Sequence, residues 1–362
     1  MKSRLRQSLT DLMLIPGLSG HEERVARAIR AALPPGISTK TDRLGNLTAS
    51  FPGDPAAPTV LLFTHMDQLG FFVRKVEADG LIRVERMGGV SERAMAAQAV
   101  VLCTAHGDIP GIIINKAHHA TGPDEKYTVL PTSDIRIDTG HGSKAAVEAA
   151  GIRIGTPVVY RPQVLPLAGD RIAGTAIDDR AGCAVLIEVA RALASRSCGP
   201  TVHLLWSVQE EFNLRGAVVA AQNLNPDIAI QIDLMLATDT PDMADRGEMT
   251  LGGGPGISLY SFHGRGTLNG VIPHPAMVQL FEATAVAQGI PLQRSAQVGV
   301  LTDLSYVQLL GQGVASIDIG FPMRHSHSAL ECCDLGDLEG LTRLTLAAIA
   351  AIGPGFDLGR EL

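Results

Sequence analysis

The chain has 362 residues, of which 46% are hydrophobic and 19% are charged, as in an ordinary globular protein. Its length favours one large domain plus a smaller one. The formal net charge is −7, and the charged residues form no long runs of one sign. We therefore expect neither a nucleic-acid partner nor a membrane partner, because both select clustered Lys and Arg. The N-terminal segment lacks the pattern of a signal peptide, and no stretch reaches the roughly 20 apolar residues of a membrane span. The cysteines have no CxxC spacing, so they indicate reduced thiols and predict a cytoplasmic location: Cys103, Cys183, Cys198, Cys332 and Cys333.

Strand-like and helix-like segments alternate through most of the chain. A helix is predicted over 23–33, with Ser19 and Glu22 at capping-box spacing before it. Short apolar runs predict strands at 47–51, 59–63, 201–208, 227–232 and 314–319. Further helices are predicted at 179–194, 214–224, 273–289 and 335–352. This alternation is typical of an α/β fold in which helices cover both faces of a mostly parallel sheet.

The region from about Gly70 to Pro162 departs from this rhythm. It contains short alternating strands, many turns and one helical piece at SKAAVEAAG. The α/β pattern then resumes near Arg171. We therefore predict a discontinuous α/β domain, residues 1–69 and 163–362, with a small all-β domain inserted at 70–162.

Chemically reactive side chains follow the ends of several predicted strands. His65 and Asp67 come directly after the strand at 59–63, and Asp233 follows the strand at 227–232. In open α/β sheets, ligand sites form beyond the carboxyl ends of the strands. A His and an Asp two residues apart fit a metal ligand and the carboxylate that accepts its other ring N–H. A turn role is the alternative for each of these residues taken alone.

Two pairs of acids and a histidine extend this pattern. Asp178 and Asp179 precede a predicted helix, so a helix N-cap is the alternative to a metal ligand. Glu210 and Glu211 follow a buried strand, where adjacent acids are unfavourable unless a cation or proton offsets their charge. Two solvated loop acids are the alternative. His327 follows the strand at 314–319, and a histidine satisfied within the fold is its alternative.

The combination favours a metal site over the separate alternatives. Five strand ends supply His, Asp, Glu, Asp and His, and such oxygen and imidazole ligands without thiolates suit Zn, Co or Mn. Two cations about 4 Å apart need one bridging carboxylate, two further carboxylates and two imidazoles. Asp67 and Glu210 remain as additional acids, and a dinuclear hydrolase needs one such acid as general base.

The sequence resembles the tetrahedral (glutamyl-type) aminopeptidases, family forty-two of the metallopeptidases. The likeness covers nearly the whole chain, and the combination of motifs is specific although no single one is. The motifs that carry it are TDRLGNL at 41–47, HMDQLGF at 65–71, IDTGHGSKAAVEAAGI at 137–152, AIDDRAG at 176–182, VQEEFNLRGA at 208–217, DTP at 239–241 and RHSHSALECCDLGD at 324–337.

This resemblance implies roles for individual residues. Five would hold two divalent metal ions: His65, Asp178, Glu211, Asp233 and His327. His65 and Asp233 would hold one ion, Glu211 and His327 the other, and Asp178 would bridge them. Asp67 would orient His65, and Asp179 would follow a cis or strained peptide that directs Asp178. Glu210 would be the general base and then the proton donor to the leaving amine.

The resemblance also implies fold, activity and assembly. It implies a zinc-peptidase/phosphorylase-like catalytic domain and a PDZ-like barrel that serves dimerisation. The implied activity is removal of N-terminal residues from peptides, with the two cations activating a bridging water. The implied assembly is a homo-oligomer, from a dimer to a dodecamer.

The chain departs from the family pattern at three positions. Gln68 stands where the family usually has Glu, Asn213 replaces a Gly, and His325 replaces a Tyr. These departures leave open the alternative of a deacylase or amidohydrolase that acts on another amide with the same metal core. A preference for acidic N-terminal residues would require a cationic side chain in the pocket, and Arg265, Arg294 and Arg324 are the candidates.

Overall fold

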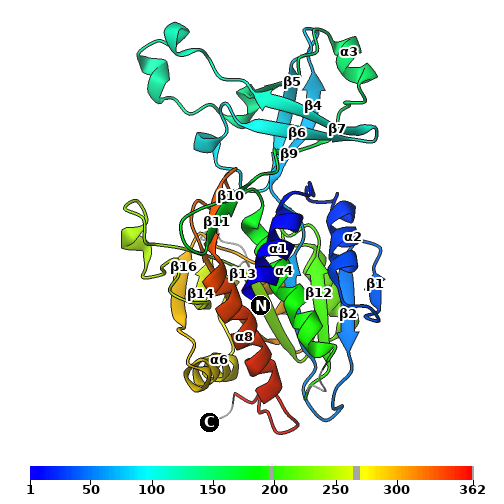
Figure 1. The fold of residues 1–362 in the computed structure, drawn as a ribbon, viewed down its shortest axis with the longest axis vertical. Helices are drawn as coiled ribbons and strands as arrows, with labels where there is room; N and C mark the ends of the chain where they lie inside the picture. Colours follow the sequence, from blue (N-terminus) through cyan, green and yellow to red (C-terminus); the bar gives the residue numbers. More distant parts are fainter. Residues whose placement is uncertain (196–198, 264–269, 361–362) are drawn as a thin grey trace.

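A computed structural model describes residues 1–195, 199–263 and 270–360. Figure 1 shows an α/β unit that carries both termini and a smaller barrel above it. The predicted fold class is confirmed: a mixed sheet is flanked by helices, and a separate small unit is all-β. Cys198 and Arg265 lie outside the described residues.

A mixed sheet of nine strands forms the centre of the α/β unit within the described part of the chain. Its strands are β1 (Thr39–Thr41), β2 (Leu47–Phe51), β3 (Val60–His65), β12 (Val202–Ser207), β13 (Ile228–Leu236), β14 (Gly256–Phe262), β15 (Gly270–Val271), β16 (Gln293–Val298) and β17 (Ala315–Met323). The order is β1-β2-β12-β3-β13-β17-β14-β15, and β16 pairs with β14. The four central strands β12, β3, β13 and β17 are parallel to one another. Their carboxyl ends therefore meet at one edge of the sheet.

Helices cover both faces of this sheet. One face packs on α1 (Lys2–Met13), α2 (Glu23–Ala32), α4 (Ile177–Leu193), α6 (Pro275–Gln288) and α8 (Leu335–Ala351). The other face packs on α5 (Gly216–Leu224) and α7 (Leu304–Val307). The central strands are buried along almost their whole length, which explains their continuously apolar sequences. In Figure 1, α1, α4 and α8 lie side by side in front of the sheet.

The all-β unit is a closed barrel in the order β4-β5-β8-β7-β6-β9, and every pairing in it is antiparallel. Its strands are β4 (Gly70–Val76), β5 (Ile82–Met87), β6 (Ala99–Thr104), β7 (Gly107–Ile113), β8 (Arg136–Asp138) and β9 (Pro157–Tyr160), with α3 (Lys144–Ala149) beside them. Its apolar interior forms a core separate from that of the α/β unit. The barrel thus interrupts the α/β unit between β3 and α4.

A three-stranded sheet lies close to the barrel: β10 (Val164–Pro166), β11 (Arg171–Gly174) and β18 (Glu331–Asp334). It pairs the chain leaving the barrel with the segment just after the predicted metal ligand His327. Among the described helices, none is both long and apolar enough to cross a membrane.

Candidate metal centre

The strand ends bring the predicted residues to one edge of the sheet. β3 ends at His65, and its partner β12 ends at Ser207, opposite His65 and just before Glu210 and Glu211. Asp233 lies on β13, and His327 follows β17. Asp178 lies at the start of α4, where its backbone is not yet helical, and the Asp178–Asp179 peptide is cis. All five predicted metal ligands, together with Glu210, line one cleft of about 450 Å³.

Asp178 lies between the two histidines. Its Oδ1 is 3.0 Å from Nε2 of His65, and its Oδ2 is 3.4 Å from Nε2 of His327. The opposite ring nitrogens face acceptors: His65 Nδ1 is 3.2 Å from the Asp67 carbonyl oxygen, and His327 Nδ1 is 3.0 Å from the Gly89 carbonyl oxygen. With Nδ1 as donor in each ring, Nε2 on the Asp178 side is the nitrogen that could bind a cation.

The ligand atoms form two groups that share Asp178. One comprises His65, Asp178 and Asp233, and the other Asp178, Glu211 and His327. Within each group, one ligand atom from every residue lies within 4.8 Å of the others. Each group could therefore surround one cation, with Asp178 common to both.

The site concentrates negative charge in a buried place. Burial raises the pKa of Glu211 to about 8 and that of Asp233 to about 7, and it raises the pKa of Glu210 well above its usual value. Burial opposes protonation of His327, but the nearby carboxylates of Glu211 and Asp178 outweigh it and raise the pKa of that histidine to about 10. Without a bound cation, protons must offset the negative charge of these closely spaced carboxylates.

Divalent cations fit this arrangement better than protons do. Glu211 belongs to the second group of ligands, and its buried Oε1 receives no hydrogen bond from the described residues. A cation would satisfy this oxygen and replace the protons held by the neighbouring acids. The donor set contains only carboxylate and imidazole groups, which suits Zn, Co or Mn.

Asp67 holds one side of the site through the backbone. Its Oδ1 lies 3.4 Å from His65 Nδ1 and accepts the Glu210 N–H at 3.0 Å. Its Oδ2 accepts the Glu211 N–H at 3.0 Å and the Ser19 hydroxyl at 2.5 Å. The capping box predicted for Ser19 is wrong, because this hydroxyl bonds to Asp67 and no side chain caps α2.

Glu331 holds the other side, and the sequence analysis missed it. Its Oε2 accepts the Asp178 N–H at 3.1 Å, and its Oε1 accepts the His327 N–H at 3.0 Å. This carboxylate is 2% exposed and lies on β18. The available signal was an acid four residues after His327 in an apolar context, ALECC.

The two members of the Asp178–Asp179 pair have separate roles. Asp179 accepts the Gly182 N–H at 3.0 Å and also contacts the Thr64 hydroxyl. It therefore satisfies the N-terminal turn of α4, as expected of an N-cap acid. Asp178 points to the histidines, so the helix-cap alternative describes only Asp179.

Comparison with known proteins identifies the family. A family model described as M42 glutamyl aminopeptidase matches residues 45–344. The chain belongs to this family. It is therefore a peptidase, and the family as a whole depends on metal ions.

Individual M42 relatives match almost end to end. The chain is 38% identical over 355 residues to the putative aminopeptidase SgcX of Escherichia coli, which covers 97% of this chain and 95% of that protein. It is 30% identical to the lysyl aminopeptidase of Pyrococcus furiosus, over 94% and 95% of the two chains. The solved TET1 peptidase of Pyrococcus horikoshii, which can assemble into a tetrahedron or a large octahedral shell, superposes with a TM-score of 0.86 at 26% identity. That superposition covers 96% of this chain and 100% of the other.

Of the three departures from the M42 pattern, one lines the cleft. Asn213 does so, whereas Gln68 is 3% exposed and accepts hydrogen bonds from the Gly17 N–H and the Arg180 guanidinium. His325 is absent from the residues that line the cleft. Of these positions, only Asn213 therefore lies where it could contact a substrate in the cleft.

Proposed function

We propose that this M42 chain is an aminopeptidase with two divalent cations per subunit. The placement of Asp178 carries the proposal, because its two oxygens each face one histidine and it belongs to both ligand groups. His65 and Asp233 would hold one cation, and Glu211 and His327 the other. The bound cations would supply Lewis-acid activation of a water molecule and of the scissile carbonyl.

Glu210 is proposed as the general base. It is 7% exposed and lines the cleft, and its Oε2 lies 4.0 Å from His65 Nε2, at the edge of the ligand cluster. Burial raises its pKa well above the usual value, which suits a group that accepts a proton from water and returns it to the leaving amine. Asp67 would position it by accepting its backbone N–H.

The activity is tested with purified protein loaded with Zn, Co or Mn. We expect turnover of aminoacyl anilides and unblocked peptides, little turnover of N-acetylated counterparts, and two bound ions per chain by metal analysis. Absence of turnover with all three metals would exclude the aminopeptidase. Equal turnover of the N-acetylated substrates would support the deacylase alternative.

We also propose that residues 70–162 form a dimerisation domain, with 1–69 and 163–362 as the catalytic domain. The barrel exposes several large apolar side chains, which are costly to leave in water: Ile112, Tyr127, Val129, Leu130 and Ile154. The assembly of the Pyrococcus horikoshii TET1 peptidase into shells of many subunits supports a homo-oligomer for this chain. Light scattering should give a mass of at least two chains of 38.1 kDa, and a monomer would contradict the proposal.

A cytoplasmic location remains part of this proposal. The described cysteines are free thiols, in keeping with a reducing compartment.

A further inference from the structure

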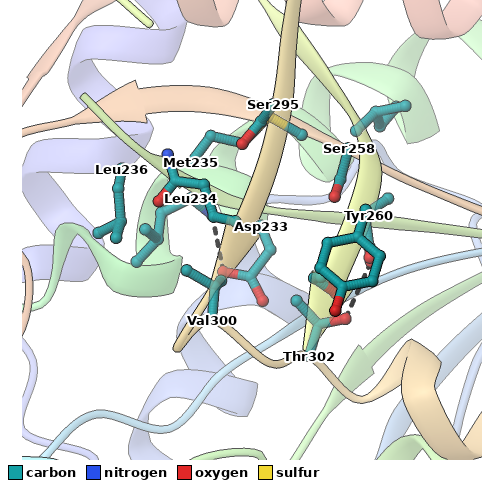
Figure 2. Close-up of a pocket in the computed structure, with 13 residues that line it drawn as sticks. Asp233, Leu234, Met235, Leu236, Ser258, Tyr260, Ser295, Val300 and Thr302 are labelled. Atoms are coloured by element: carbon teal, nitrogen blue, oxygen red, sulfur yellow. Dashed lines mark hydrogen bonds between the residues drawn. The ribbon is translucent and has the colours of Figure 1, made fainter. Parts of the chain in front are cut away.

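A small cavity lies beside the cleft, and Val300 and Thr302 are among its lining residues. Asp233, Leu234, Leu236, Val300 and Thr302 line both spaces. Figure 2 shows Asp233, Tyr260 and Thr302 turned toward the same space. The cavity is therefore an inward continuation of the cleft on the Asp233 side.

The residues that line this cavity include three with buried polar atoms that lack protein partners within the described part of the chain. Three buried atoms in its lining have no hydrogen bond within the described residues: Asp318 Oδ2, Gln297 Oε1 and the Ser261 hydroxyl oxygen. Their residues are 3%, 6% and 4% exposed. Two of these atoms are acceptors only, and the third can also accept, so the cavity offers three acceptors to a guest that donates.

The charge of the lining is one-sided. Asp233 and Asp318 are its only charged residues, and both are acidic. Asp318 receives one hydrogen bond, at 2.9 Å from the Thr302 hydroxyl, and burial raises its pKa to about 7. A buried carboxylate in this state gains most from a cationic donor.

Two of the three candidate cations for an acidic substrate, Arg294 and Arg324, are absent from the lining of the cleft and pair with acids elsewhere. Arg294 pairs with Glu282 at 2.7 Å, both partly exposed, and Arg324 pairs with Asp239 at 2.6 Å. No Lys or Arg lines the cleft among the described residues. The described part of the cleft therefore offers no Lys or Arg to a substrate side-chain carboxylate.

The separation of the two acids and the volume of the cavity favour an ammonium over a guanidinium as the bound cation. In the register of β13 and β17, Asp318 lies opposite Gln231, which is two residues before Asp233. The backbone positions of Asp318 and Asp233 are therefore offset by about 6.6 Å along the strands. An extended lysyl side chain spans about 6 Å from Cα to Nζ, from bond lengths near 1.5 Å. The cavity has a volume of about 20 Å³, which accommodates about one water-sized group. An ammonium has this size, whereas a guanidinium is larger.

We propose that Asp318, with Gln297 and the Ser261 hydroxyl, binds the ammonium of an N-terminal lysine of the peptide substrate. The methylene stem would pass between Leu234, Leu236 and Val300, which line both spaces. This inference rests on the proposed aminopeptidase activity. It makes Asp318 a specificity residue and adds no step to the reaction.

The test compares lysyl and norleucyl anilides with the metal-loaded enzyme, because norleucine lacks only the ammonium. We expect kcat/KM to favour lysine by roughly 10- to 100-fold, the usual effect of a hydrogen bond to a charged group. Arginyl anilide should react several-fold more slowly than lysyl. In Asp318→Asn the lysine/norleucine ratio should fall at least about tenfold. In Glu282→Gln, which removes the same charge at a partly exposed ion pair, the ratio should not change.

The outcomes separate the two proposals. Turnover of norleucyl anilide without a preference for lysine would overturn the inference and leave the aminopeptidase intact. An unchanged ratio in Asp318→Asn, or arginine equal to lysine, would also overturn it. Lack of turnover of every anilide would overturn both. Should Asp318→Asn not fold, competitive inhibition of the unmodified enzyme by free lysine and norleucine decides, and equal inhibition would exclude an ammonium site.

Discussion

The two sides of the candidate metal centre are built from different parts of the fold. His65 and Asp233 are 1% and 6% exposed and belong to central strands of the sheet. The side chain of His327 is 37% exposed, lies in a loop, and contacts the Gly89 carbonyl between barrel strands β5 and β6. The first side is therefore fixed by the core, whereas the second depends on how the barrel and the loop after β17 meet.

Two carboxylates accept backbone N–H groups from the loops that carry the candidate ligands. Asp67 accepts those of Glu210 and Glu211, and Glu331 accepts those of Asp178 and His327. Both carboxylates are buried and close to the ligands. The comparison shows that strand ends alone do not position the ligands, because a buried acid also holds the backbone of their loops. Three predictions test this comparison, from the largest expected effect to the smallest.

The largest effect should separate the two adjacent glutamates. Glu210→Gln should lower kcat by about 10² to 10⁴, because the general base is lost, while both metal ions stay bound. Glu211→Gln should lose one ion per chain as well as activity, because it removes a ligand of the second side. Anilide hydrolysis and metal analysis of the same preparations measure both. Metal loss in Glu210→Gln would mean that the two roles are exchanged.

A smaller effect should distinguish the two holding carboxylates. Glu331→Gln should weaken cation binding by roughly 10- to 100-fold, as changes to groups around metal ligands usually do. Asp67→Asn should weaken both cations, because Asp67 lies beside His65 and accepts the Glu211 N–H, and it should also lower kcat, because Asp67 accepts the Glu210 N–H. Chelator competition counts the affected ions. Glu339→Gln, on the partly exposed outer surface near Lys2, is the matched control and should change neither quantity. Because Glu331 holds His327 as well as the shared Asp178, the cation beside His327 should be weakened more, and a larger loss of the cation beside His65 would refute the division into two sides.

The smallest effect concerns the stability of the metal-free protein. Glu211, Asp233 and Glu331 have pKa values raised by burial to between about 7 and about 8, and nearby acids raise the pKa of His327 to about 10 against the opposing effect of burial. Groups with raised pKa values bind more protons in the folded than in the unfolded state, so stability falls as pH rises from their unfolded values through these folded ones. The Tm should therefore fall by a few degrees between about pH 5 and about pH 9.

Metal binding should reverse this trend. The ligands must lose their protons to bind a cation, so stabilisation by Zn or Mn should grow over the same pH range. Thermal melting with and without metal measures it. A Tm of the metal-free protein that rises with pH would contradict the sign.

The strands, most helices and the candidate ligands could be predicted because they follow from local patterns. Buried parallel strands need continuously apolar runs, and each run here ends at or just before a polar residue such as His65 or Asp233. The capping box at Ser19 was predicted wrongly, because spacing does not show that this hydroxyl faces Asp67, 48 residues away. Glu331 was missed for a similar reason, since its partners are backbone N–H groups that any sequence possesses.

The sequence by itself determined the fold class and the set of groups that can bind cations, because hydrophobic periodicity and residue chemistry are local properties. The resemblance implied that Asp178 bridges the cations, and only the tertiary structure showed the contacts behind this division: Asp179 satisfies the helix start, and Asp178 lies between the histidines. The tertiary structure also decided that Asp318 lines a cavity next to the cleft. These outcomes depend on which side chains and backbone groups meet across strands far apart in the chain, and the directions of those side chains are set by packing.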